Sequence, residues 1–143
     1  MRFYKNNAYP EIFLHDCRFK MAYENKNLRL IFEDGFAVKT GNCIEKKKGY
    51  IQISDMPLIE ISIRGLKGEM QGNIYKETVA QIEFSDLCLL LRNSFLEVVD
   101  EYYNCMGLLY RCCITPYHEN QKFDRIELTI DFEHRALEYY MEK

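Results

Sequence analysis

Apolar and polar residues alternate along most of this chain, and this period of two constrains the fold more than any other feature of the sequence. The clearest run places Ile126, Leu128, Ile130 and Phe132 at every second position, with charged or hydroxyl-bearing residues between them. Successive side chains of a β-strand point to opposite faces of a sheet, so this run has one apolar and one polar face. We therefore expect antiparallel strands that each bury one face.

The spacing of apolar residues also predicts how neighbouring strands pair. A loop over residues 24–27 sets Tyr23 opposite Leu28 and Met21 opposite Leu30, so that apolar side chains meet on one face of a hairpin.

Two glycines mark further predicted turns. A three-residue loop with Gly35 in the left-handed conformation pairs Phe32 with Phe36. In the same way, Asn104 opens a type I turn in which Gly107 takes the left-handed position.

A few segments depart from the strand pattern. Ser85 is a candidate N-cap for a helix over residues 86–93, and the tail over residues 134–143 also fits a short helix. Residues 65–72 contain a Gly-x-x-Gly sequence, which we interpret as a solvated loop. The predicted fold is α+β and mainly β, an antiparallel meander sheet or partly closed barrel of about seven or eight strands with one or two short helices.

Length and composition limit the possible classes of protein. The 143 residues carry a formal net charge of −3, with 48% hydrophobic and 29% charged residues, which is typical of one globular domain over 1–143. A slightly acidic chain has no general electrostatic attraction to nucleic acid or anionic membranes. The longest apolar run, residues 87–91, is far too short to cross a bilayer.

The six cysteines are expected to be reduced thiols. Most of them lie in apolar stretches, where cysteine packs like a small hydrophobic residue, and the sequence opens without the apolar segment of a signal peptide. We therefore expect a cytoplasmic protein.

The densest group of reactive side chains is His15-Asp16-Cys17, at the start of a predicted strand. In an enzyme, His15 could act as a base for a Cys17 nucleophile, and His118 could join them in a catalytic or metal site. Neighbouring strand residues face opposite ways, however, and no metal-ligand or nucleotide-binding motif is present. We therefore expect His15 to bond a backbone group and Cys17 to pack inside, with no metal and no cofactor.

A tyrosine-rich acidic surface is the preferred binding site. In the register set by the Asn104 turn, Tyr102 faces the core, whereas Glu101, Tyr103 and Arg111 share the outer face. Charged residues around a large aromatic ring are typical of interfaces. These three residues are the predicted partner-binding site, and the acidic surface predicts a basic partner.

The start of the chain also resembles known proteins. Residues 9–17, with the sequence Tyr-Pro-Glu-Ile-Phe-Leu-His-Asp-Cys, precede a hairpin whose second strand is residues 28–35. This arrangement resembles a recurring start among small β-rich bacterial proteins, some of which are similar to immunity proteins of polymorphic toxin systems. The resemblance covers the first quarter of the chain and implies a protein-binding module without assigning any residue a role.

Sequence reasoning therefore leads to a small cytosolic protein-binding module, of the immunity type, that occludes a functional site of its partner. Two alternatives remain open. One is a small hydrolase or metal-dependent enzyme using His15 and His118, and the other is a phage-type or structural oligomer subunit that pairs sheet edges.

Overall fold

The computed structural model describes residues 2–4, 12–104, 106–116, 118, 121–133 and 135–142, without the side chains of residues 2–4 and 40. The strands and helices, in chain order, are β1 (Arg2–Tyr4), β2 (Ile12–Phe13), β3 (Arg18–Glu24), β4 (Asn27–Thr40), β5 (Cys43–Ile53), the 3-10 helix η1 (Leu58–Glu60), β6 (Ile61–Gln71), β7 (Ile74–Gln81), α1 (Phe84–Leu90), β8 (Phe95–Tyr103), β9 (Gly107–Thr115), β10 (Arg125–Asp131) and β11 (Leu137–Met141).

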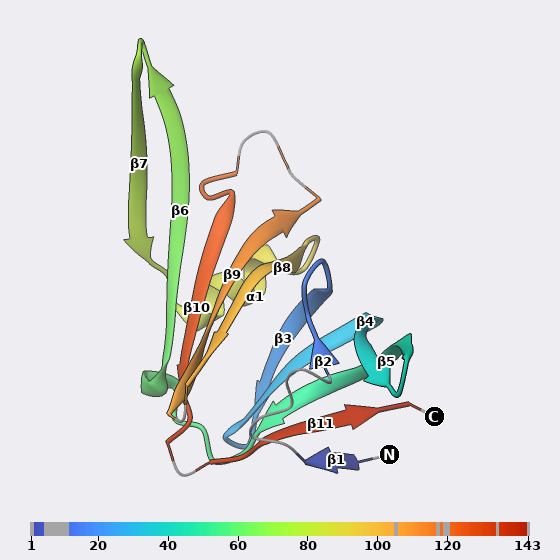
Figure 1. Ribbon diagram of the computed structural model, residues 1–143. Coiled ribbons are helices and arrows are strands. Elements are labelled where there is room, and N and C mark those ends of the chain that lie inside the picture. Colours follow the sequence, from blue (N-terminus) through green and yellow to red (C-terminus); the bar gives the residue numbers. More distant parts are fainter. Residues whose placement is uncertain are drawn as a thin grey trace.

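All of the strands belong to one antiparallel sheet. Its order is β1-β11-β5-β4-β3-β8-β9-β10-β6-β7, and β2 pairs with β4 beside this path (Figure 1). The mainly-β α+β fold is therefore confirmed. The sheet has eleven strands and not seven or eight, because short strands such as β1, β2 and β11 were not counted. It is not closed into a barrel, since β1 and β7 end the strand order at opposite edges.

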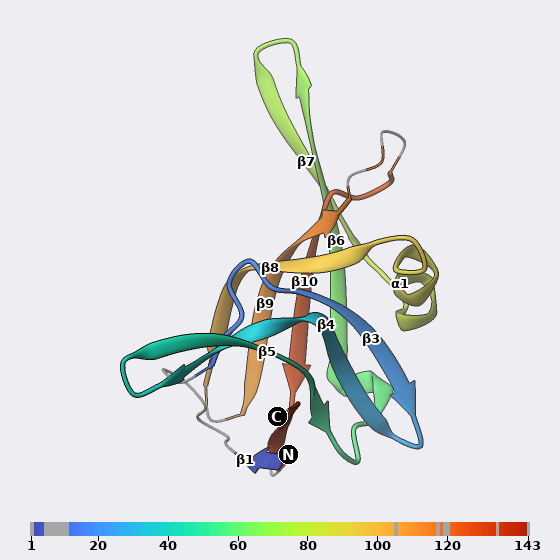
Figure 2. The same cartoon turned by 90° about the vertical axis from the view of Figure 1, so that its right-hand side faces the viewer.

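The sheet bends at β3, which divides it into two half-sheets (Figures 1 and 2). Residues 20–24 of β3 pair with β4, whereas Arg18 and Phe19 pair with β8. We call β1, β11, β5, β4 and β3 the first half-sheet, and β8, β9, β10, β6 and β7 the second half-sheet. This geometry places an apolar layer between the two half-sheets, as between the two sheets of a sandwich.

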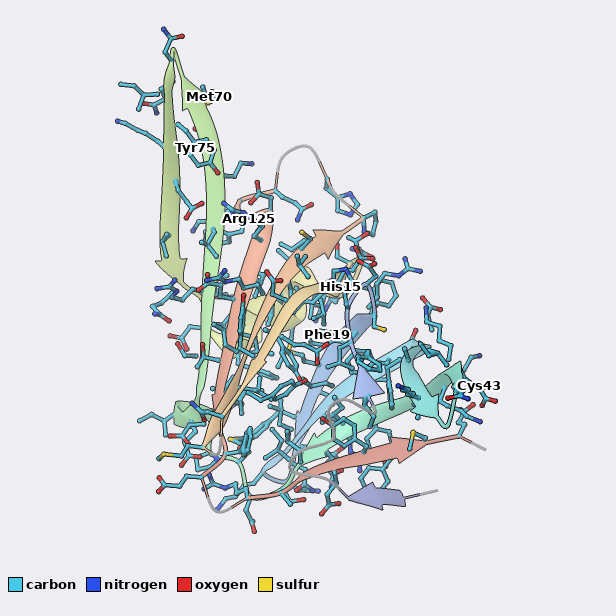
Figure 3. All side chains as sticks on the ribbon, in the orientation of Figure 1. His15, Phe19, Cys43, Met70, Tyr75 and Arg125 are labelled. Atoms are coloured by element: carbon cyan, nitrogen blue, oxygen red, sulfur yellow. The ribbon has the colours of Figure 1, made fainter. Side chains whose placement is uncertain are left out.

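Phe19 lies at the centre of this layer (Figure 3). Its ring centroid is 5.2 Å from that of Phe32 in the first half-sheet and 6.4 Å from that of Tyr110 in the second. The apolar residues of the clearest alternating run, on β10 and at Phe132 directly after it, are all buried in the same core, as predicted.

The predicted register of the first hairpin is also confirmed. Tyr23 lies opposite Leu28 and Met21 opposite Leu30. The connection is tighter than the predicted four-residue loop, because Glu24 pairs with Asn27 and only two residues with positive φ lie between them.

The hairpin predicted at Gly35 is wrong, although its side-chain contact is correct. Strand β4 continues through this point, and its pairing with β5 shifts register between Phe32 and Phe36. Gly35 has the expected left-handed φ of 92°, which allows a bulge in place of a turn. The bulge keeps both phenylalanines on the buried face, with ring centroids 5.4 Å apart.

Two helix predictions need correction. The interior helix exists, but its N-cap is Glu83, so Ser85 lies within the first turn and does not cap it. The predicted helix in the tail is instead strand β11. Leu137, Tyr139 and Met141 are buried at every second position, because the segment pairs with β5 on one side and β1 on the other.

Gly65 and Gly68 also lie in a strand, β6, and not in a loop, whereas Gly72 lies in the turn after it. A Cβ atom at Gly65 would come within 2.5 Å of Phe123 Cγ, and one at Gly68 would overlap the ring of Tyr75. Both positions therefore need glycine because an aromatic ring packs against the strand there.

The turn after β8 is capped by Asn104, whose Oδ1 accepts 2.8 Å hydrogen bonds from the N–H groups of Met106 and Gly107. Gly107 does not take the predicted left-handed conformation. It is required because a Cβ atom there would lie 2.6 Å from the carbonyl oxygen of Ile130.

Candidate functional site

His15 lies in a tight turn that fastens the chain to an irregular point in β8. The Asp16 N–H donates to the Val98 carbonyl at 2.8 Å, and the His15 Nδ1–H donates to the Val99 carbonyl at 2.7 Å. Because this nitrogen bonds a carbonyl oxygen, it must carry the proton. The imidazole is otherwise exposed, with its Nε2 3.4 Å from the Asp16 carboxylate. The predicted bond from His15 to the backbone is therefore confirmed.

Cys17 points in the opposite direction. Its side chain is buried in the core, and its thiol lies 3.7 Å from the carbonyl oxygens of Phe13 and His15. Burial raises the pKa of this thiol, which disfavours the thiolate needed for nucleophilic attack. The structure does not bring the His15 imidazole and the Cys17 thiol together.

His118 is held elsewhere, in the segment after β9. Its N–H donates to Gln121 Oε1. Strand β9 ends at Thr115, opposite Phe95, and this point is about 13 Å along β8 from the Val99 carbonyl that holds His15. Among the residues that the structure describes, no three His, Cys, Asp or Glu side chains gather as they would around a metal ion.

The predicted partner-binding residues do not share one face, because β8 contains a bulge. Its pairing with β9 shifts register between Val98 and Asp100, which sets Glu101 opposite Tyr110. Each later residue of β8 is therefore rotated by one position relative to the prediction.

The rotation exchanges the two neighbouring tyrosines. Tyr103 and Glu101 turn inward and are only partly exposed, whereas Tyr102 is 49% exposed on the outer face. Arg111 remains on the outer face, opposite Asp100. The predicted surface of Glu101, Tyr103 and Arg111 is therefore wrong as a single patch.

Glu101 and Tyr103 instead form an internal cluster with two other tyrosines. The Tyr103 hydroxyl donates to Glu101 Oε1 at 2.6 Å and lies 3.0 Å from the hydroxyl of Tyr110. Glu101 Oε2 also accepts the Leu14 N–H at 2.7 Å. We call Glu101, Tyr103, Tyr110 and Tyr139 the acid–tyrosine cluster. It joins the segment before β3 to the second half-sheet.

The acid–tyrosine cluster keeps its phenols protonated. Desolvation by burial raises the pKa of Tyr103, Tyr110 and Tyr139, and the nearby Glu101 carboxylate acts in the same direction. Neutral phenols that are already hydrogen-bonded are suited to holding the fold together.

The outer face of the second half-sheet carries ion pairs between neighbouring strands. Arg64 Nη2 lies 2.7 Å from Glu127 Oε2, and Arg111 Nε lies 3.6 Å from the other oxygen of the same carboxylate. The Arg111 guanidinium also lies 5.6 Å from the centre of the Tyr102 ring. Beside these residues, a hollow of about 240 Å³ has Cys113 and Arg125 in its lining. Arg64 and Arg111 therefore pair with the same carboxylate, and Asp100, opposite Arg111, also lies on this face.

The β6–β7 hairpin extends beyond the rest of the molecule (Figures 1 and 2). Strand β10 pairs with β6 only as far as Leu66, so residues 67–78 form a ribbon of two strands, which we call the arm. At 3.4 Å per residue, the arm projects about 17 Å past Leu66.

Large apolar side chains are exposed on this arm. Met70 and Tyr75 lie opposite each other on the outer face and are 64% and 57% exposed (Figure 3). Ile74 is 64% exposed on the other face of the ribbon. At the base of the arm, Arg125 Nη2 lies 2.5 Å from Glu77 Oε2. Sequence reasoning missed the arm, although Ile74, Tyr75 and Val79 are residues that favour strands.

A pocket lies at the base of the arm, on the face that carries Ile74. Its volume is about 250 Å³, and its apolar lining includes Ile82, Leu87, Leu90 and Phe123. Helix α1 supplies two of these side chains.

No protein-family model matches the sequence, and searches of curated proteins and of solved structures gave no match. Within the described part of the chain, every helix is too short or too polar to span a lipid bilayer.

Proposed function

We propose that the chain is a protein-binding module that contacts its partner through the outer face of the second half-sheet and the arm. The observation that carries this proposal is the arm, which holds Met70 and Tyr75 in solvent beyond the body of the protein. Exposed apolar groups beside a polar surface are typical of interfaces.

The construction of the arm supports the same proposal. An isolated ribbon of two strands is marginally stable in water, because it cannot bury its apolar side chains. The ring of Tyr75 gains some burial by packing over Gly68, but Met70 has no comparable cover. A partner that covers the outer face of the arm would bury this side chain.

The contact surface continues from the arm onto the sheet. Tyr102 lies opposite Leu109, which pairs with Thr129, which in turn pairs with Ser62 of β6. Opposite residues share a face, so Tyr102 faces the same side as Met70. The proposal therefore rests on apolar contact through the exposed Met70, Tyr75 and Tyr102 side chains on this side.

The proposed mechanism is occlusion. A projecting ribbon can enter a concave functional site of a partner while the sheet covers its rim, which would be the action of an immunity-type inhibitor. Occlusion needs a surface only, and no catalytic group of this chain takes part.

The test is capture of partners by a variant with a changed outer face. The double variant Met70→Ser/Tyr102→Ser removes two exposed apolar side chains from this face. The native protein and the variant are each immobilised and exposed to extract from the source cell, and bound proteins are quantified by mass spectrometry. We expect the proposed partner to be retained by the native protein and reduced at least about tenfold on the variant.

The matched control is Ile44→Ser/Leu89→Ser, with one change in β5 and one in α1, away from the outer face of the second half-sheet. These two side chains are 68% and 54% exposed, so the control removes a comparable apolar surface. The proposal requires the control to retain the partner at the native level. Equal retention by both double variants would overturn it.

A further inference from the structure

Strand β7 has a free edge whose backbone groups can be assigned. The Ile82 N–H donates to the Ile63 carbonyl at 2.9 Å, so these two residues form a hydrogen-bonded pair. Hydrogen-bonded and non-hydrogen-bonded pairs alternate along an antiparallel ladder, and the β6–β7 ladder has no register shift. The N–H and C=O groups of every second residue therefore point away from β6, namely those of Tyr75, Glu77, Val79 and Gln81.

This edge has few of the features that block pairing with another strand. Residues 74–81 form an unbroken ladder without a bulge or a proline, and no strand follows β7 in the described sheet order. Regular exposed edges of this kind are templates for a further strand.

A second copy of the chain can pair with this edge in only a few registers. When two identical strands pair side by side about a two-fold axis, one residue lies opposite itself. Centring on Lys76 or Glu77 sets two like charges opposite each other, which is destabilising. Centring on Thr78 sets two hydroxyl side chains opposite each other and forms hydrogen-bonded pairs between Glu77 and Val79.

The pocket at the base of the arm selects between the remaining registers. Centring on Thr78 sets Ile74 of one copy opposite Ile82 of the other, on the face where that pocket opens. Opposite side chains have Cβ atoms about 5 Å apart, so the exposed Ile74 would enter the pocket. Centring on Val79 would set Ile74 opposite Phe84, which belongs to helix α1 and cannot continue the ladder.

We propose that two copies of this protein associate through their β7 edges, antiparallel and centred on Thr78, with Ile74 of each copy filling the apolar pocket beside Ile82 of the other. The second half-sheets then form one continuous sheet across the two-fold axis. This proposal goes beyond partner binding and uses the edge and inner face of the arm, whereas the partner surface is its outer face.

The first test is a cross-link at the two-fold axis. In the proposed register Thr78 is a non-hydrogen-bonded pair with itself, with a Cα–Cα distance of about 4.5 Å, which a disulfide can span. We expect Thr78→Cys to form a disulfide between two copies under mild oxidation, identified by mass spectrometry of the linked peptides. Lys76→Cys is the control, because its two Cα atoms would be about 13 Å apart. Equal cross-linking of the two variants would overturn the proposed register.

The second test measures the mass of the purified protein in solution by light scattering over a range of concentrations. We expect a reversible dimer, and we expect Ile74→Ser to raise its dissociation constant at least about tenfold. Met70→Ser is the control, because its side chain is equally exposed but lies on the other face of the arm, and it should leave the dimer unchanged. A monomer at every concentration up to about 1 mM would overturn the proposal.

These outcomes separate the two proposals. A monomer that still loses its partner on Met70→Ser/Tyr102→Ser contradicts only the dimer. A dimer whose partner capture is unaffected by that double variant contradicts only the partner surface.

Discussion

Strands β8 and β6 both carry aromatic or apolar side chains near their ends, but they use them in opposite ways. The hairpin of β8 and β9 lies between β3 and β10 in the sheet, and a bulge in β8 turns Tyr103 into the core. In β6, pairing with β10 stops at Leu66, and Met70 stays in solvent. Alternation in the sequence therefore divides the side chains of a strand between two faces. Neighbouring strands and bulges decide which of the two faces is buried, or whether both stay exposed.

The strongest test of this contrast is truncation of the two neighbouring tyrosines of β8. Tyr103→Ala removes a packed ring and leaves Glu101 without its phenol donor, so we expect a loss of about 4 kcal/mol in the free energy of unfolding. Tyr102→Ala removes an exposed ring and should cost less than about 1 kcal/mol. Urea unfolding of both variants measures the difference, and equal losses would show that the bulge does not set the register.

Alkaline pH should weaken the core around the acid–tyrosine cluster. The pKa values of Tyr103, Tyr110 and Tyr139 are raised in the native state, so above the ordinary value of about 10 the unfolded chain binds fewer protons than the native one. The contribution of these tyrosines to the free energy of unfolding is therefore fully present below about pH 10. Above this pH it falls by up to about 1.4 kcal/mol per pH unit for each tyrosine.

Urea midpoints at a series of pH values test this dependence. Tyr103→Phe should lower stability at neutral pH, because Glu101 loses a hydrogen bond, but its decline above about pH 10 should be shallower. The same slope in the variant and the native protein would mean that Tyr103 does not remain protonated on folding.

The arm should contribute little to global stability. Replacing residues 67–78 by a two-residue turn removes a ribbon that the body does not cover, so we expect the free energy of unfolding to change by no more than about 1 kcal/mol. Hydrogen exchange of the native protein provides a second measurement, since arm amides should exchange by local opening and amides beside Phe19 only on global unfolding. A loss of several kcal/mol would show that the arm is part of the core.

The smallest effect is expected at His15. His15→Ala removes one hydrogen bond to the bulge carbonyl at an exposed site, so we expect a loss of about 0.5 kcal/mol. Asp16→Asn is a suitable control, because asparagine also tolerates the positive φ of 63° at this position. A loss of several kcal/mol for His15→Ala would contradict this expectation and would show that the His15 hydrogen bond is important for the stability of the whole fold.

Some parts of the structure could be predicted from the sequence because the local pattern was sufficient. The β10 run and the pairing of Tyr23 with Leu28 depend only on alternation and a short loop. The bulge in β8 could not be predicted, because Val99 has nothing that distinguishes it from a regular strand residue. The tail was ambiguous, since Leu137, Tyr139 and Met141 fit a strand while Leu137 and Met141 also fit a helical spacing. Its pairing with β5 decided the outcome.

The candidate site was predicted less well than the fold for the same reason. Arg111 was assigned to the correct face, but Glu101 and Tyr103 lie beyond the bulge and were assigned to the wrong one. The arm depends on where β10 stops pairing with β6, which is set by the path of a distant segment and not by residues 67–78 themselves.

The pairing of β1 with β11 bears on how fast the chain can fold. Arg2 lies opposite Tyr140, so this edge joins residues from nearly the two extremes of the sequence. Local hairpins such as β6–β7 can form within microseconds, whereas this contact must wait until almost all of the chain is ordered. Proteins dominated by such distant contacts fold over milliseconds to seconds, and we expect this chain to belong to that slow class.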